Sequence, residues 1–147
     1  MAPRHDSPSS TKSSPVSRVL SGYHHVSLSV RDLDASSEWY VRVLGLEPLF
    51  DETGEGRRGR VFRLPGTSSM LGLTEHRDNS GNAFEPASTG LDHVAFAVPT
   101  RGGIDEWVTR LDSFGVTHSG PIDIPVGAML NLSDPDGVQL SIFFEEV

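Results

Sequence analysis

The stretch His24-His25-Val26-Ser27-Leu28-Ser29-Val30 decides the fold, because polar and apolar side chains alternate along it. This period of two predicts a β-strand that packs its valines and leucine against a core and leaves His25 on the opposite face. The same design returns in Asp92-His93-Val94-Ala95-Phe96-Ala97-Val98. His25 and His93 therefore occupy equivalent positions of two similar strands.

The segments that follow the two strands also correspond. Aligning His93 with His25 pairs Trp107 with Trp39. Because the unit occurs only twice and two small sheets are not stable separately, we interpret the chain as a duplicated βαββ module whose halves bury their faces together. This predicts an α+β fold in which the modules, about 22–76 and 91–147, form a curved mixed sheet around a central cleft. A polar linker, 77–90, joins them.

Local signals divide each module further. In the first module, Asp32 or Asp34 can cap a helix that Gly45 ends, and residues 51–59 are expected to form a mobile loop because glycines interrupt a charged run. Strands are predicted at 61–64 and 69–74. In the second module, an apolar stripe predicts a helix over about 104–111. Strands are expected at 129–132 and 138–144, on either side of the turn Asp134-Pro135-Asp136-Gly137.

Composition excludes several classes of protein. The 147 residues include no cysteine, which rules out disulfides, thiolate nucleophiles and cysteine-ligated metals. A formal charge of -8 opposes nucleic acid as a partner. The sequence has neither an apolar run of about 18 residues nor a signal-peptide core, so we expect no membrane association and a cytoplasmic location. Residues 1–21, rich in Ser and Pro, are expected to be a disordered leader before a single domain at 22–147.

Further motifs accompany the two histidine strands, namely Trp39-Tyr40, Leu44-Gly45-Leu46, Gly90-Leu91-Asp92-His93 and Asp134-Pro135-Asp136-Gly137. Together, over about 23–147, they resemble the vicinal oxygen chelate (VOC) superfamily, which includes glyoxalase I, extradiol dioxygenases, fosfomycin-resistance enzymes and bleomycin-binding proteins. The resemblance implies a glyoxalase-like fold, a small-molecule substrate or ligand and a homodimer. Because one fold carries many chemistries, it leaves the reaction open.

The resemblance also implies a metal site, from which this chain departs. His25 and His93 match the two histidine positions of the metal-dependent members, which implies a divalent ion such as Fe, Ni, Zn, Mn or Co. Gly72 and Ser141, however, stand where the family places its carboxylate ligands. Two histidines alone bind such an ion weakly, since a resident metal generally needs three protein donors. The cofactor is therefore a divalent metal held by a reduced ligand set, or none.

Other side chains on the predicted cleft faces are candidates for chemistry or binding. His76 is a candidate acid–base group, because alternation keeps it on the face of Gly72, and Ser141 is a candidate at the lost ligand position. The candidate substrate-binding residues are Tyr23, Arg63, Thr74, Phe84, Gln139 and Phe143. Arg57, Arg58 and Arg60 are the main basic cluster, which is either an anion-binding site or a solvated loop.

A metal-assisted enzyme is the favoured function, and three alternatives stay open: a metal-free enzyme, a binding or resistance protein, and an interaction or sensor module without catalysis. A metal-assisted lyase, isomerase or oxygenase would polarise substrate oxygens with the ion. A metal-free enzyme would use histidine as acid and base. A metal-free binding or resistance protein would sequester an antibiotic or natural product in a pocket lined by aromatic residues, and its histidines would be ancestral ligands hydrogen-bonded in the pocket.

Overall fold

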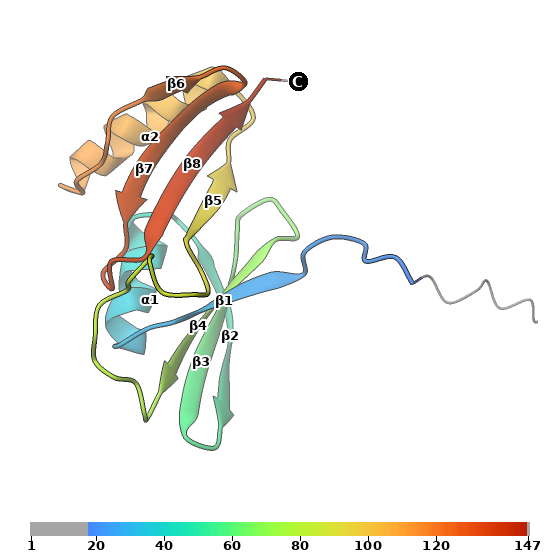
Figure 1. The fold of residues 1–147 in the computed structure, drawn as a ribbon, viewed down its shortest axis with the longest axis vertical. Coiled ribbons are helices and arrows are strands. Elements are labelled where there is room, and N and C mark those ends of the chain that lie inside the picture. The colour runs from blue at the N-terminus through green and yellow to red at the C-terminus, as the bar shows by residue number, and fades with distance from the viewer. Residues whose placement is uncertain (1–17, 147) are drawn as a thin grey trace, which may run out of the picture.

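The computed structural model describes residues 18–146. Figure 1 shows two modules, each a sheet with one helix against it, and an arm of residues 18–24 that runs away from both. The elements are β1 (His25–Ser29), α1 (Leu33–Arg42), β2 (Glu47–Gly54), β3 (Arg57–Arg63), β4 (Met70–His76), β5 (His93–Ala97), α2 (Arg101–Ser113), β6 (Ile122–Ile124), β7 (Gly127–Ser133) and β8 (Gln139–Glu145). Most of the expected leader, residues 1–17, lies outside the described part. Neither α1 nor α2, the helices of 18–146, is long and apolar enough to cross a membrane.

The strand order is the same in both modules. The first sheet runs β1-β4-β3-β2 and the second runs β5-β8-β7-β6. In each sheet one pair is parallel, β1 with β4 and β5 with β8, and the other pairs are antiparallel. This confirms the duplicated α+β module. Each copy also has an edge strand, β2 or β6, that the sequence pattern did not predict.

Residues 51–59 belong to a β-hairpin, so the prediction of a mobile loop is wrong. Strands β2 and β3 pair from Glu47 opposite Arg63 to Gly54 opposite Arg57. The chain turns between them at Gly56, whose φ is +70°. Every residue of β2 is exposed. A strand exposed on both faces needs no apolar alternation, and periodicity therefore could not reveal it.

The alternation of the first strand orients its side chains as predicted. Leu28 is buried, whereas His25, Ser27 and Ser29 are exposed on the other face. On β5, His93 is exposed and the neighbouring Val94 is half-buried. The apolar faces of the two sheets and the helices share one core that includes Tyr40, Phe62, Ile104, Leu130 and Ile142. The two modules thus bury their faces together.

Helix α1 begins with two side-chain caps. Asp32 Oδ1 accepts a hydrogen bond from Ala35 N at 3.0 Å, which confirms one of the two predicted caps. Glu75 Oε2, on β4, accepts another from Leu33 N at 2.7 Å. These bonds satisfy amides that a helix start leaves without partners. The helix ends at Arg42, and Gly45, with φ of +73°, turns the chain toward β2.

The turn Asp134-Pro135-Asp136-Gly137 of the second module docks against α1 of the first. Tyr40 Oη donates to Asp134 Oδ2 at 2.7 Å, and Arg31 Nε donates to Asp136 Oδ1 at 2.6 Å. Both aspartates are 6% exposed and Tyr40 is fully buried, so these bonds replace the water that the groups lose. Burial raises the pKa of Asp134, and burial beside this carboxylate raises the pKa of Tyr40.

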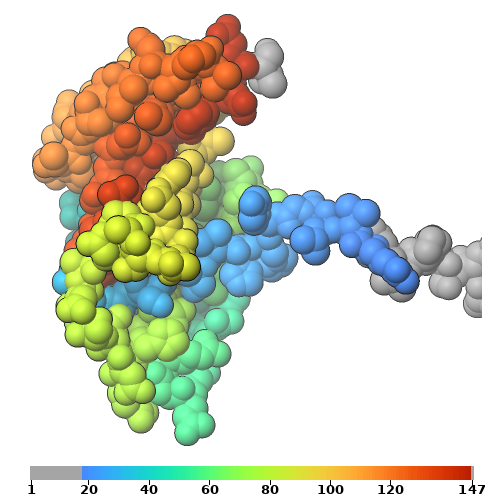
Figure 2. All heavy atoms as spheres, in the orientation of Figure 1, coloured from blue at the N-terminus to red at the C-terminus, as the bar shows by residue number. Residues whose placement is uncertain are grey.

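Two further contacts complete the junction between the modules. Phe84, in the connector between β4 and β5, donates its N–H to Asp136 O at 2.8 Å and packs its ring on the core. Figure 2 shows this connector, in yellow-green and yellow, lying across the front of the junction. From α2, Arg110 Nε donates to Val43 O at 2.7 Å, next to the last residue of α1. The junction therefore fixes how the two sheets are placed.

Replacing Tyr40 by Phe removes the donor to Asp134 without changing the packed ring. Oδ2 of the buried carboxylate then lacks its donor, while Oδ1 keeps the N–H groups of Asp136 and Val138. The free energy of unfolding should therefore fall by about 1–3 kcal/mol in chemical denaturation. Tyr23→Phe is the matched control, because Tyr23 is fully exposed. Equal stability of the two variants would contradict the importance of this bond.

Replacing Glu75 by Gln should lower the melting temperature at neutral pH. The N–H of Leu33 and then the guanidinium of Arg58 hold the pKa of Glu75 below its ordinary value of 4.5. A pKa lowered by folding stabilises the protein above 4.5, and this contribution is lost as pH falls through the folded-state value. The two melting curves should therefore differ at pH 7 and converge in acid.

The matched control for this titration is Glu55→Gln, in the β2–β3 turn, whose melting temperature should follow the unsubstituted chain at every pH. If the melting temperatures of Glu75→Gln and the unsubstituted chain differ by the same amount at every pH, the charge of Glu75 contributes nothing to stability.

Candidate functional site

Each of the two cavities that contain a predicted histidine ligand lies on one sheet, and the larger of these two is on the second module. This second-sheet cavity has a volume of about 590 Å³, and its lining includes His93, His118, Met129, Asn131, Gln139 and Ser141. Strand pairing places Asn131 opposite Ser141 and His93 beside Gln139. These four residues therefore share the face of the sheet that α2 leaves uncovered.

Ser141 and Asn131 form a hydrogen-bonded pair inside this cavity. Ser141 Oγ donates to Asn131 Oδ1 at 2.7 Å, and Ser141 is only 9% exposed. The backbone of Asn131 is held from the other side, because its N–H donates to Ser119 Oγ at 3.0 Å and its carbonyl accepts from Ser119 N at 2.9 Å. A neutral, rigidly held pair thus occupies the position at which the resemblance implies a carboxylate.

His93 is oriented by its neighbour in the chain. Its Nδ1 lies 2.6 Å from Asp92 Oδ1. An ionised carboxylate only accepts hydrogen bonds, so Nδ1 carries a proton and Nε2 is the nitrogen left for a ligand, a proton or a metal. The side chain of His93 is 52% exposed at the mouth of the cavity.

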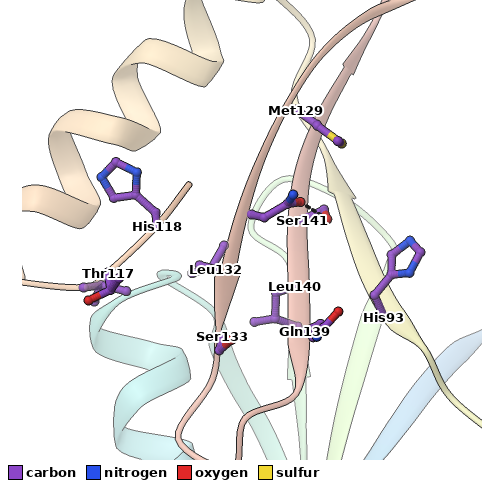
Figure 3. Close-up of a pocket in the computed structure, with 11 residues that line it drawn as sticks. His93, Thr117, His118, Met129, Leu132, Ser133, Gln139, Leu140 and Ser141 are labelled. Atoms are coloured by element: carbon purple, nitrogen blue, oxygen red, sulfur yellow. Dashed lines mark hydrogen bonds between the residues drawn. The ribbon is translucent and has the colours of Figure 1, made fainter. Parts of the chain in front are cut away.

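His118 contributes to the wall of the cavity but faces away from His93. Gly120 N donates to His118 Nδ1 at 3.0 Å, and His118 Nε2 lies 2.7 Å from Asp112 Oδ1. With Nδ1 accepting, Nε2 carries the proton, and this ring is neutral. Figure 3 shows His93, Gln139 and Met129 on one side of the β7–β8 pair and His118 and Thr117 on the other. His118 thus fixes the 117–120 segment.

The first module carries a smaller cavity of about 180 Å³, lined by His24, His25, Ser27, Gly72 and Thr74 among others. His24 Nδ1 and His25 Nδ1 lie 2.9 Å apart, and Ser27 Oγ lies 3.1 Å from Thr74 Oγ1. A Cβ atom at Gly72 would lie 3.0 Å from Ser27 Oγ. Ser27 therefore occupies the space that a carboxylate side chain at this position would need.

The two predicted metal ligands lie in different cavities of the chain, His25 in the first and His93 in the second. Residues 18–146 contain no group of three histidine or carboxylate side chains that could hold a metal ion. Gly72 supplies no donor, and the hydroxyl proton of Ser141 is committed to Asn131. The donor set on either sheet does not fit a resident divalent ion, which generally needs three protein ligands.

The remaining predicted residues are dispersed. His76 shares the face of Gly72, as alternation predicts, but it lies at the exposed end of β4, opposite Arg57. Thr74 lines the smaller cavity and Gln139 the larger one. Four others lie outside the lining of both cavities: Tyr23 on the exposed arm, Arg63 at the exposed end of β3, Phe84 in the connector, and Phe143 farther along β8.

Two members of the arginine cluster, Arg58 and Arg60, are engaged in ion pairs. Arg58 Nη2 lies 3.2 Å from Glu75 Oε2, and Arg60 Nε lies 2.6 Å from Asp51 Oδ1. Both also pair with Asp34 of α1. The hydrogen bond to Glu75 raises the pKa of the Arg58 guanidinium, and the hydrogen bond to Asp51 raises that of Arg60. These pairs favour a structural role over anion binding for Arg58 and Arg60.

Sequence reasoning did not single out Asn131 or Ser119. Asn131 lies in a predicted strand, and alternation alone would have placed it on the face of Met129. Its pairing with Ser141 depends on the register of β7 and β8, for which a single sequence carries no direct signal.

Comparison with known proteins identifies the family. Residues 22–142 match the model of the Glyoxalase/Bleomycin resistance protein/Dioxygenase superfamily, and the chain belongs to this family. It is 30% identical over 128 residues to biphenyl-2,3-diol 1,2-dioxygenase 3 of Rhodococcus globerulus, a match that covers 80% of this chain and 61% of that enzyme. This chain thus spans less than two thirds of the dioxygenase.

Solved structures share the fold. A glyoxylase/bleomycin resistance protein/dioxygenase domain from Frankia sp. EAN1pec aligns with a TM-score of 0.81 and 32% identity, covering 87% of this chain and 94% of that one. The fosfomycin resistance protein FosX of Listeria monocytogenes, solved with Mn(II) and a dihydroxypropylphosphonic acid, aligns with a TM-score of 0.67 and 18% identity over 88% and 95% of the chains. The superfamily includes dioxygenases, lyases and resistance proteins.

Ser141→Glu places a carboxylate at the position for which the resemblance implies one. Because this side chain shares a face with His93, the variant should bind Mn(II) or Ni(II) at least about tenfold more tightly than the unsubstituted chain in calorimetry on chelated protein. Thr109→Glu, exposed on α2, adds the same charge outside the cavity and should change nothing. Tight stoichiometric binding by the unsubstituted chain would show that its donor set suffices.

Proposed function

We propose that this protein binds a small, uncharged, oxygen-bearing molecule in the second-sheet cavity without a resident metal. The observation that carries the proposal is the Ser141–Asn131 pair, which puts neutral hydrogen-bonding groups where a metal ligand would stand. Superfamily relatives bind small molecules, as FosX does in its solved complex. The chemistry of the ligand is therefore set by the polar groups of the cavity.

The charge of the ligand follows from the lining. The cavity is lined by histidine, amide, hydroxyl and apolar side chains, and no Asp, Glu, Lys or Arg of the described residues is among them. A charged ligand would lose its hydration there without gaining an opposite charge. Gln139 and Asn131 offer donors and acceptors, while Met129 offers an apolar contact. These groups suit an uncharged molecule that carries hydroxyl or carbonyl groups on a partly apolar skeleton.

A second candidate, proton transfer without a metal, is favoured by the Asp92–His93 contact. A carboxylate that fixes Nδ1–H leaves Nε2 directed away from it, which is how an imidazole is prepared to act as a base. His93 is then the acid–base group, in place of His76, which lies on the first sheet and does not line this cavity. A homodimer whose interface covers the exposed His93 would exclude water from such a reaction.

Binding can be tested with 2-hydroxyacetophenone, an uncharged hydroxyketone, titrated into the ¹⁵N-labelled full chain in EDTA. Amide signals of β7 and β8 should shift, and Gln139→Ala should weaken the affinity about three- to tenfold through one lost hydrogen bond. Ser27→Ala, in the smaller cavity, is the control and should leave the affinity unchanged.

Two outcomes would contradict the proposal, namely no shift on β7 and β8, or affinity that appears only after Mn(II), Fe(II) or Ni(II) is added. Mass analysis of the hydroxyketone recovered from D₂O separates the two candidates, because a binder returns it without carbon-bound deuterium, whereas a proton-transfer enzyme returns it with deuterium at the carbon from which the proton is removed.

A further inference from the structure

The amide of Asn131 has a fixed orientation. Its Oδ1 accepts the hydroxyl proton of Ser141 at 2.7 Å, so Nδ2 points the other way. Within residues 18–146, Nδ2 makes no hydrogen bond, although the backbone groups of Asn131 are both paired with Ser119. An amide NH₂ that makes no hydrogen bond in the folded chain is a donor available to a ligand.

This donor is accessible from the cavity. No polar side-chain atom of the described, non-exposed residues is both fully buried and unpaired. Asn131 is only half-buried, and its unpaired Nδ2 therefore has accessible surface. Because Asn131 faces the second-sheet cavity from β7, a molecule bound there meets this donor.

The opposite side of the site offers an acceptor. His93 Nδ1 is turned to Asp92, which leaves Nε2 for the ligand, and this nitrogen accepts a hydrogen bond when the ring is neutral. His93 lies on β5 and Asn131 on β7, with β8 between them. Two strand spacings and a register offset of two residues separate their backbones by about 12 Å, a gap that the two side chains and a small molecule can fill.

We infer that Asn131 is a specificity-determining residue that selects ligands with a carbonyl oxygen facing β7, while a hydroxyl of the same molecule faces His93. The inference rests on the proposed function and names its ligand class, the uncharged hydroxy-carbonyl compounds. Ser141 acts as a positioning residue, because it holds the amide with its NH₂ group toward the ligand. A molecule with hydroxyls at both ends can still bind, but a hydroxyl is a poorer acceptor for this donor than a carbonyl.

The test compares two uncharged probes that differ only at one oxygen, 2-hydroxyacetophenone and 1-phenylethane-1,2-diol. In nuclear magnetic resonance titrations of the full chain, the ketone should bind about three- to tenfold more tightly than the diol. The side-chain Nδ2 protons of Asn131 should shift with the ketone and much less with the diol. This comparison needs no variant and is therefore independent of any effect of substitution on folding.

Two variants sharpen the test. Asn131→Asp keeps an acceptor for Ser141 but replaces the NH₂ donor by an oxygen, so the preference for the ketone should disappear while the diol still binds. Ser141→Ala releases the amide and should reduce the preference without abolishing binding. Both variants are first checked for an unchanged pattern of backbone amide signals outside the cavity.

The outcomes separate this inference from the proposed function. If both probes shift cavity signals with equal affinity, or if Asn131→Asp keeps the ketone preference, the specificity role is overturned and the proposed binding site stands. If neither probe shifts any signal of β7 or β8, both are overturned.

Discussion

The burial of two carboxylates between the modules is the constraint on which the rest of the structure depends. Asp134 and Asp136 belong to a turn of the second module, but their partners Tyr40, Arg31 and Ser36 belong to α1 of the first or precede it directly. A carboxylate loses its hydration when buried, and only specific donors compensate for that loss. The turn can therefore dock in one position, and this position sets the relation between the two sheets.

That docking leaves the polar face of each sheet uncovered. The helices occupy the apolar faces, where the shared core forms, and the histidine faces remain for ligands. Because the modules are duplicates, the same registers recur on both sheets, with Gly72 beside Ser27 and Ser141 beside Ala95. The copies have nevertheless diverged. In the first, Ser27 fills the space beside Gly72, while in the second, Ser141 and Asn131 line a cavity more than three times as large.

Neutral hydrogen bonds, more than charges, dominate the larger cavity. Arg58 and Arg60 of the first module, which do not line this cavity, are paired with Glu75, Asp34 and Asp51. Exposed pairs of this kind contribute little each to stability, but they occupy the guanidinium groups that would otherwise attract anions. The acidic chain thus carries its most developed cavity in an uncharged region, where the direction of each hydrogen bond matters more than the net charge.

The sequence by itself determined the duplicated module, the family and the outward faces of His25 and His93, because alternation and turn residues are local properties of the chain. The resemblance also implied that Gly72 and Ser141 stand at positions where the family has carboxylates. Local patterns could not reveal β2, which is exposed on both faces, or the register that joins Asn131 to Ser141. Only the tertiary structure decided that His25 and His93 line separate cavities, because the docking of Asp134 and Asp136 on α1 sets the distance between residues far apart in sequence.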